Sequence, residues 1–475
     1  MNYEPVIGLE VHAQLLTQSK LFCGCPTTFG APPNTNICPV CTGQPGALPV
    51  LNRTAVEFAI RAGLALQCTI APRSVFARKN YFYPDLPKGY QISQYERPLC
   101  EHGFLDCDLD GATKRITIQR IHMEEDAGKL LHDAHDRYSH VDLNRSSVPL
   151  IEIVSGPDLR STAEATAYLK QLRNILMYLR ICDGNMQEGS LRCDANISMR
   201  PVGSKAFGTR TELKNLNSFR FLEHAITYEM QRQIAVLEAG GRVEQETRLW
   251  DEAAGRSASL RSKEEAHDYR YFPDPDLCPL QVEAAWLEAI RGALPELPQQ
   301  KMERYVRALG LSEYDARVLT ADQQVAHFFE AAIGHHASPK ALCNWITSEL
   351  QGRLNAANLD IAQAKITPAH LATLVKRIED GTITGKMAKG VFEVMYQDGA
   401  DPETIIQQQG LKQVSDPAAL EPVIDAILAA NAANVAAYRA GKTNLLAFFI
   451  GQVMKQTKGQ ANPQLLQALL KKKLG

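Results

Sequence analysis

The order of apolar and polar residues gives the first information about this chain. Apolar residues occupy roughly every second position in four segments, which we predict to be β-strands: "VIGLEVHAQL", "KRITIQRIHM", "PLIEIVS" and "SLRCDANISM". Two other segments, near residues 161–181 and 219–239, repeat their apolar residues at helical spacing. The first begins with Ser161 and has Glu164 three positions later, as in a capping box, and the second stops before Gly240.

A proline-containing stretch, "ALPELPQQ", ends this mixture of strands and helices near residue 294. Almost everything beyond it has helical composition without a convincing strand. We therefore expect the main domain boundary at this point. The length of 475 residues, of which 45% are hydrophobic, suits a globular protein of two or three domains.

Charge and hydropathy narrow the classes of protein that fit. A formal net charge of -2 excludes a uniformly basic nucleic-acid coat, but residues 411–475 carry eight lysines and arginines against three acids. This tail could contact phosphate, or it could be an ordinary solvated helical face. The first residues lack the basic flank and apolar run of an export signal, and no stretch approaches eighteen apolar residues, so we expect a cytoplasmic protein without a membrane span.

Ionisable side chains occur on predicted strands whose other residues are apolar. Glu10 and His12 are two residues apart, so they project from the same face of their strand. Glu152 lies within "PLIEIVS", where an ionised carboxylate is costly unless it is paired, hydrogen-bonded or bound to a metal. Each pattern also fits the solvated face of an amphipathic strand.

The acidic triplet from Glu124 to Asp126 directly follows the alternating "KRITIQRIHM". On its own, such a triplet indicates a solvated turn at the end of a strand. If the polar faces of several strands line one cavity, however, their side chains would form an oxygen-rich site suited to Mg²⁺. The predicted ligands are Glu10, His12, Glu125 and Glu152, with Glu188 or Asp194 as further members.

Cations and aromatic rings are interleaved in "ARKNYFYPDLPKGYQISQ". The segment contains Arg78, Lys79, Tyr81, Tyr83 and Lys88. This composition can hold a phosphate and stack a base or a ribose. A proline-containing surface loop whose aromatic rings pack inward fits it equally well. A later run, "LRSKEEAHDYRYFPDPDLCPL", has a similar composition.

Four cysteines near the N-terminus have the spacing C-x-C-x12-C-x2-C, formed by Cys23, Cys25, Cys38 and Cys41. This spacing is close to that of a structural zinc site, in which four thiolates close a tetrahedron. Four reduced thiols in a loop are the alternative. The seven other cysteines are scattered, and we expect them to be packing residues.

Two further patterns carry less weight. His132, His135 and His140 lie between strand-like stretches without a spacing that would bring metal ligands together, so we expect a mobile loop there. The sequence "AGKTN" ends like a phosphate-binding loop but has Ala436 where the earlier glycine belongs, and no strand precedes it. Any nucleotide must therefore bind without a P-loop. No stretch rich in glycine and serine supplies an amidase-like nucleophile.

Nine ordered segments, distributed over nearly the whole chain, give a more specific signal. They are "GLEVHAQL", "KNYFYPDLPKGYQISQ", "HMEEDAGK", "VPLIEIVSGPDLRS", "EGSLRCDANISMRP", "ELKNLNSF", "ETRLWDE", "RSKEEAHDYRYFPDPDL" and "GQVMKQTKGQANP". Together they closely resemble the B subunits of heterotrimeric aspartyl/glutamyl-tRNA amidotransferases. The resemblance implies an α+β cradle domain with an antiparallel or mixed sheet (residues 1–294), an all-α helical domain (295–405) and a small helical tail domain (406–475) that touches tRNA.

The resemblance also implies a reaction. A side-chain carboxylate on mischarged Glu-tRNA(Gln) or Asp-tRNA(Asn) would be phosphorylated by ATP and then attacked by ammonia from an amidase (A) subunit, and a small C subunit would complete the complex. Phosphoryl transfer depends on positioning and charge neutralisation more than on covalent help.

The carry-over of site residues follows the matching motifs. It assigns Mg²⁺ to Glu10, His12, Glu125 and Glu152, and zinc to the four cysteines. It assigns catalytic roles to Glu125, Lys79 and Lys88, near the exit of the ammonia path, while Arg78, Tyr81 and Tyr83 are the candidates for nucleotide binding. The alternative is a scaffold that presents tRNA without performing chemistry.

Overall fold

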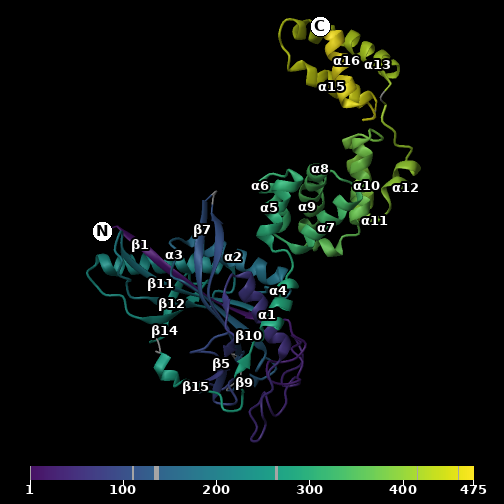
Figure 1. Cartoon of the computed structure of the whole chain (residues 1–475). Helices are drawn as coiled ribbons and strands as arrows, with labels where there is room; N and C mark the ends of the chain where they lie inside the picture. The colour runs from purple at the N-terminus through teal and green to yellow at the C-terminus, as the bar shows by residue number, and fades with distance from the viewer. Residues whose placement is uncertain (1, 110–111, 133–137, 263–265, 415, 458) are drawn as a thin grey trace. The chain divides into compact units, whose positions relative to one another are not determined.

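The computed structural model describes residues 2–475 except 110–111, 133–137, 263–265, 415 and 458. It divides into two compact units, Met1–Leu297 and Pro298–Gly475. The first contains the strands and the second contains helices, as Figure 1 shows. The predicted fold class, α+β followed by all-α, is confirmed.

The first unit is built on a nine-stranded mixed sheet with the order β14-β13-β12-β11-β1-β10-β7-β6-β2. All neighbouring strands are antiparallel except β12 and β13, which are parallel. The four predicted strands form its centre, in the order β11-β1-β10-β7. The strands are β1 (Tyr3–Gln14), β2 (Thr69–Ile70), β6 (Cys100–Leu109), β7 (Ala112–Glu125), β10 (Pro149–Ser155), β11 (Leu191–Pro201), β12 (Thr211–Lys214), β13 (Glu246–Asp251) and β14 (Arg256–Ser262).

One face of this sheet is part of the hydrophobic core. Val11, Ile153 and Cys193 on neighbouring strands are at most 2% exposed, and they belong to one buried cluster with residues of the helices. These helices are α1 (Arg53–Ala65), α2 (Thr162–Tyr178), α3 (Phe219–Glu238) and α4 (Ala284–Gly292). Because successive strand residues point to opposite faces, the polar residues between the buried ones lie together on the other face.

The helix starts agree with their sequence signals, with one difference. Ser161 caps α2 by accepting a hydrogen bond from the backbone N–H of Glu164, and Ser218 caps α3 in the same way. The Glu164 carboxylate does not complete the expected capping box, because it accepts instead from the N–H of Arg160 at 2.6 Å and from Lys114 at 2.6 Å. The nearby lysine and the preceding N–H thus take the place of the cap residue's own N–H.

Three smaller sheets complete the first unit. Strands β4 (Ala77–Asn80), β5 (Tyr90–Ser93) and β15 (Phe272–Pro273) form one, and β3 (Arg73–Ser74) pairs with β16 (Leu280–Gln281). A short 3-10 helix, η1 (Ala266–Tyr269), precedes β15.

The third small sheet corrects the prediction of a loop around the three histidines. It is a hairpin of β8 (Lys129–His132) and β9 (Ser139–Asp142), in which Leu131 pairs with His140. His132 and His140 therefore lie on strands, while His135 lies outside the described residues. The strands are only four residues long and mostly polar, so their alternation is too short to detect.

The second unit contains two hydrophobic clusters, one within α5–α12 and one within α13–α16. The described part of this unit has no strand beyond a bridge between Val414 and Ala461. Its elements are α5 (Pro298–Leu309), α6 (Glu313–Thr320), α7 (Gln323–His335), α8 (Pro339–Asn344), the π-helix η2 (Trp345–Leu350), α9 (Gln351–Ala356), the 3-10 helix η3 (Ile361–Gln363), α10 (Pro368–Glu379), α11 (Gly385–Asp398), α12 (Pro402–Gln408), α13 (Pro417–Ala430), α14 (Ala432–Arg439), α15 (Leu445–Gln456) and α16 (Pro463–Leu474).

No single helix in the described part of the chain is both long enough and apolar enough to span a membrane. Only α13 and α14 taken together, with a bend of 91° between them, meet these criteria of length and composition.

Candidate functional site

A band of ionisable side chains crosses the polar face of the central strands. The register places Glu10 opposite Asp194, His12 opposite Glu152, and Glu152 opposite His122. The band runs from β12 to β7 and divides into two groups that could each hold a cation. The sequence alternation predicted this face for β1, β10 and β11.

The first group joins two imidazoles and two carboxylates. His12 Nε2 lies 3.3 Å from Glu152 Oε2 and 3.8 Å from Glu124 Oε1. His122 Nε2 lies 3.4 Å from the same Glu152 oxygen and 3.7 Å from Glu124 Oε2. None of the four side chains is more than 17% exposed. Ligand atoms of His12, Glu124 and Glu152 lie within 4.8 Å of one another, which is close enough for them to share one ion.

Unlike charges shift the pKa values of this group in opposite directions. Burial alone would lower the pKa of His122, but the Glu152 and Glu124 carboxylates outweigh it and raise this pKa to about 9. Burial alone would raise the pKa of Glu152, yet the two imidazoles hold it well below its usual value. The pKa of His12 is raised by the same carboxylates. His12 is the imidazole among the residues that could share an ion, and it can bind a metal only through an unprotonated nitrogen, so cation binding should strengthen as the pH rises.

The second group offers oxygen ligands only. Carboxylate oxygens of Glu10, Asp194 and Glu212 lie within 4.8 Å of one another. Lys214 Nζ is 2.6 Å from Asp194 Oδ2 and 3.2 Å from Glu212 Oε1, so one cation already faces three acids. Burial, followed by the neighbouring carboxylates, raises the pKa of Glu10. Carboxylate oxygens are the ligands that Mg²⁺ prefers, so this group fits the predicted ion well.

The structure divides the predicted ligand set between these groups. Glu10 belongs to the second group, and the residue that lies beside His12 and Glu152 in the first group is Glu124, not Glu125. The reason is strand alternation: His122 faces Glu152, so Glu124, two positions further, shares its face, whereas Glu125 points to the opposite face.

Glu125 is buried and held by the small sheet that contains β5. Lys88 Nζ donates to Glu125 Oε1, which also accepts from the N–H of Ile92 at 2.8 Å. Gln91 donates to the Glu125 carbonyl at 2.7 Å. The second carboxylate oxygen, Oε2, is buried without a hydrogen-bond partner among the described residues. Lys88 and Glu125, which the resemblance assigns to one place, are therefore in direct contact. The roles predicted for them, including that of Glu125 as a metal ligand, stay predictions.

Asp126 completes the acidic triplet, and none of the three acids is in a solvated turn. Asp126 is 4% exposed and accepts from Gln14 at 2.7 Å and from Arg192 at 3.0 Å, while Arg145 lies 3.7 Å away. Glu188, a further predicted member, is exposed in the turn before β11.

Not all residues of the segment with cations and aromatic rings are available to the site. Arg78 is already paired with Asp274 at 2.9 Å and Asp276 at 2.8 Å, and it stacks on Tyr90 with 4.2 Å to the ring centroid. Its guanidinium therefore holds β4 to the segment around β15. Tyr83 is 56% exposed.

Tyr81 lies close enough to the acidic band to be affected by the charge of Glu124, and Lys79 lies beside the ring of Tyr81. Lys79 Nζ is 4.8 Å from the ring centroid of Tyr269 and 5.8 Å from that of Tyr81, and it has no carboxylate partner among the described side chains. Burial and then the Glu124 carboxylate raise the pKa of Tyr81. Tyr271, which sequence reasoning did not single out, has its pKa shifted in the same direction by burial and then by Glu124. The only sequence signal for it was its place in the later aromatic run.

Two other features were not predicted. His122 belongs to the first group, and its spacing to Glu124 is the same two-residue pattern that identified Glu10 and His12. A cavity of about 620 Å³ opens beside Glu10 and is lined in part by Phe207, Thr209 and Arg210. Its volume is typical of small-molecule sites, and its walls come from the central strands together with residues 207–210, which lie between β11 and β12 in a segment without a periodic signal.

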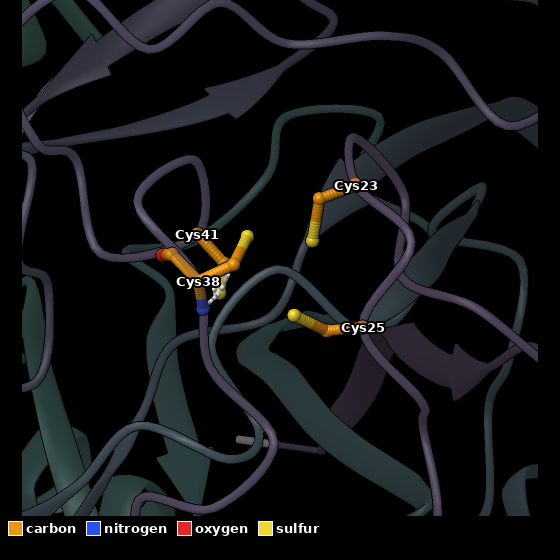
Figure 2. Close-up of side chains that lie close together, drawn as sticks. All are labelled: Cys23, Cys25, Cys38 and Cys41. Carbon is orange, nitrogen blue, oxygen red and sulfur yellow. Dashed lines mark hydrogen bonds between the residues drawn. The ribbon is translucent and has the colours of Figure 1, made fainter.

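The four cysteines come together in a separate cluster. Figure 2 shows the side chains of Cys23 and Cys25 facing those of Cys38 and Cys41. Their four sulfurs lie within 4.8 Å of one another, and the N–H of Cys38 donates to Cys41 Sγ at 3.2 Å. A hydrogen bond from Cys23 lowers the pKa of Cys41 to about 4. Four converging sulfurs match the donor set of a closed structural zinc site.

Of the other seven cysteines, six are buried as predicted. They are Cys68, Cys100, Cys107, Cys182, Cys193 and Cys343. Cys278 is exposed, so the prediction that it is a packing residue is wrong.

Comparisons with known proteins agree over the whole chain. A family model described as "GatB/GatE catalytic domain" matches residues 5–288, and one described as "GatB domain" matches residues 327–474. Relatives whose names give them as B subunits of an aspartyl/glutamyl-tRNA(Asn/Gln) amidotransferase are 61% identical in Syntrophotalea carbinolica, 60% in Solidesulfovibrio magneticus and 57% in Myxococcus xanthus. Each alignment covers 100% of this chain and at least 99% of the relative.

Proposed function

The chain belongs to the family of aspartyl/glutamyl-tRNA(Asn/Gln) amidotransferase B subunits, and from this premise we propose that the polar face of its central sheet activates the aminoacyl carboxylate of mischarged tRNA. The complex in which it acts is a glutamine-dependent aminoacyl-tRNA amidotransferase of the ligase type. The observation that carries the proposal is the band of acids in two cation-sized groups on adjacent strands.

The proposed substrates are Glu-tRNA(Gln), Asp-tRNA(Asn) or both. The side-chain carboxylate oxygen attacks the γ-phosphorus of ATP, ADP leaves, and the substrate carries an acyl phosphate. Ammonia then attacks the acyl carbon, inorganic phosphate leaves, and the nitrogen loses a proton to give the amide. The carboxylate is a poor electrophile, so the first step is what makes the second possible.

The residues of the band have separate tasks in this scheme. Glu10, Asp194 and Glu212 would hold Mg²⁺ through their carboxylate oxygens, and His12, Glu124 and Glu152 would hold a second cation. The ion would supply positive charge that neutralises the negative charge developing during phosphoryl transfer. The nucleotide enters beside these groups, and the cavity next to Glu10 offers it space.

Lys79 and Lys88 have different roles in the proposed reaction, one toward the phosphate and one toward ammonia. Lys79 lacks a carboxylate partner among the described side chains, so its ammonium is available for a phosphate oxygen. Lys88 is fixed by Glu125, and this pair lines the place where ammonia arrives. Tyr81 supports Lys79 through its ring. Arg78 would hold β4 to the segment around β15 through its ion pair with Asp274. Tyr83 would offer its exposed ring to the nucleotide.

The proposed partners are an amidase (A) subunit that supplies ammonia, a small C subunit and the tRNA itself. The basic tail would contact the tRNA backbone, because Lys471 and Lys472 on α16 are exposed and carry positive charge. The four cysteines are proposed to hold structural zinc, which would fasten a loop that has little core of its own.

The test uses the reconstituted complex with mischarged tRNA, ATP and glutamine. His12→Ala, Glu152→Gln and Glu10→Gln should each abolish amidated tRNA while glutamine hydrolysis remains measurable. Glutamine hydrolysis is the internal control for assembly, because it occurs on the partner subunit. Amidation that survives in all three variants would contradict the proposal and favour the alternative, a scaffold that only presents tRNA.

A further inference from the structure

A lysine is buried completely beside the cysteine cluster. Lys20 is 0% exposed, and its Nζ lies 3.5 Å from Cys41 Sγ and 3.3 Å from the backbone oxygen of Leu143. No carboxylate of the described residues forms an ion pair with it. A buried ammonium is costly unless negative charge faces it, and a carbonyl oxygen supplies only a partial charge. The negative charge must therefore come from the sulfur side.

The cysteine cluster can supply this charge when it holds a metal. Thiolates bound to Zn²⁺ are deprotonated, so four of them around a divalent ion carry a net charge of -2. Such a charge also needs compensation, and the Lys20 ammonium contacts Cys41, which alone of the four cysteines is buried, at 1% exposed. The positive charge of Lys20 and the net negative charge of the metal-bound cluster thus compensate each other.

We propose that Lys20 is the built-in counter-cation of the four-cysteine metal site and positions the loop that carries it. This rests on the proposed zinc binding. The ammonium offsets one of the two excess negative charges and hydrogen-bonds Cys41 Sγ, while the backbone N–H of Lys20 donates to the Cys25 carbonyl at 2.9 Å. Lys20 therefore contacts both cysteine pairs, Cys23–Cys25 through its backbone and Cys38–Cys41 through its side chain.

The same residue links the metal loop to the acidic band. The segment after Leu143 returns to the cysteines through Ser146, whose hydroxyl donates to the Cys41 carbonyl at 3.2 Å. It continues to the end of β7, where the N–H of Ser147 donates to the Asp126 carbonyl at 2.9 Å. A metal-filled loop fastened by Lys20 consequently supports the backbone that carries the acidic triplet.

A second contact joins the loop to Lys88. Gly43, two residues after Cys41, has a φ of +68°, and a Cβ built there would lie 2.5 Å from Cγ of Lys88. Only glycine fits both the backbone conformation and this close approach. The turn that holds two of the sulfurs is therefore packed directly against the lysine that pairs with Glu125.

The experiment measures zinc affinity of the full-length chain by competition with a chromophoric chelator. Lys20→Met removes the charge with little change in volume and should weaken binding roughly 10- to 100-fold, the range typical when a residue that supports metal ligands is lost. Lys20→Arg keeps the charge and should stay within a few-fold of wild type. Lys301→Met removes another buried ammonium, which pairs with Glu330 far along the sequence, and should leave zinc affinity unchanged.

Cobalt substitution separates loss of charge from loss of a ligand. Lys20→Met loaded with Co²⁺ should keep the intense sulfur-to-metal absorption of four thiolates, since all four cysteines remain. A zinc affinity of Lys20→Met equal to that of wild type would overturn the role of Lys20. A tenfold loss of zinc affinity in Lys20→Arg would overturn it as well, and this variant tests the charge even where Lys20→Met does not fold. A wild-type chain that binds neither Zn²⁺ nor Co²⁺ would overturn the zinc proposal itself.

Discussion

Replacement of Glu125 by glutamine should destabilise the first unit strongly. The ion pair of Lys88 and Glu125 is nearly closed to solvent, with 10% and 2% of the two side chains exposed. Removal of one partner from a buried pair costs about 3–5 kcal/mol, because the other charge stays buried without compensation. The glutamine oxygen can still accept from the N–H of Ile92, so we expect a loss near the lower end, about 3 kcal/mol.

Urea unfolding followed by tryptophan fluorescence measures this change. In a Trp345→Phe background the signal comes from Trp250 and Trp286, which both lie in the first unit. The matched control is Asp106→Asn on the same sheet, whose ion pair with Arg115 is open to solvent, with 40% and 58% of the two side chains exposed, and should contribute little. A loss in Glu125→Gln no larger than that of Asp106→Asn would refute the reasoning.

Three further predictions concern stability. Ser161→Ala removes the cap of α2 and should cost about 1 kcal/mol in urea unfolding, whereas Ser161→Asp should cost little; equal losses would contradict the capping role. Leu172→Ala empties a fully buried position and should cost about 2–5 kcal/mol by the same method, and a change under about 1 kcal/mol would contradict the packing. Burial alone would raise the pKa of Glu330, but hydrogen bonds from Lys301 and Arg304 outweigh it and lower this pKa. The stability that the Glu330 carboxylate contributes is therefore present above the unfolded pKa of 4.5 and is lost as the pH falls through the lower folded pKa. In thermal unfolding between pH 5 and 3, a Glu330→Gln chain should therefore lose less stability than wild type. Parallel stability curves for the two chains would contradict this role of Glu330.

The central strands could be predicted from the sequence because alternation reports which face of a strand is buried. Glu10 and His12 were placed on one face together, and Glu152 was recognised because an acid among apolar residues needs a partner. The fold class followed from the change of periodicity near residue 294, and the structure divides after Leu297.

The division of the band into two groups could not be predicted from the sequence. It depends on the register between strands, which pairs His12 with Glu152, 140 positions away, and Glu10 with Asp194, 184 positions away. The face on which Glu124 lies depends on continuing the strand alternation from His122, which pairs with Glu152, into the acidic triplet.

The contacts of two cationic side chains, Arg78 and Lys20, also depend on residues far away in the sequence. Arg78 has the composition of a phosphate ligand in its own segment, but its carboxylate partners Asp274 and Asp276 lie almost 200 residues away. Lys20 had no sequence signal at all, since a single lysine near a cysteine pair is ordinarily a solvated residue. The ion pairs of Arg78 and the burial of Lys20 are evident only from the structure.

The measurement that tests the central claim most directly is the release of ADP by the reconstituted complex, with mischarged tRNA, Mg²⁺ and α-labelled ATP but no amide donor. The account predicts that release requires the mischarged tRNA in wild type, is lost in Glu124→Gln, and is retained in the control Asp106→Asn. Release by Glu124→Gln at the wild-type rate would contradict the assignment of the polar face as the site of carboxylate activation.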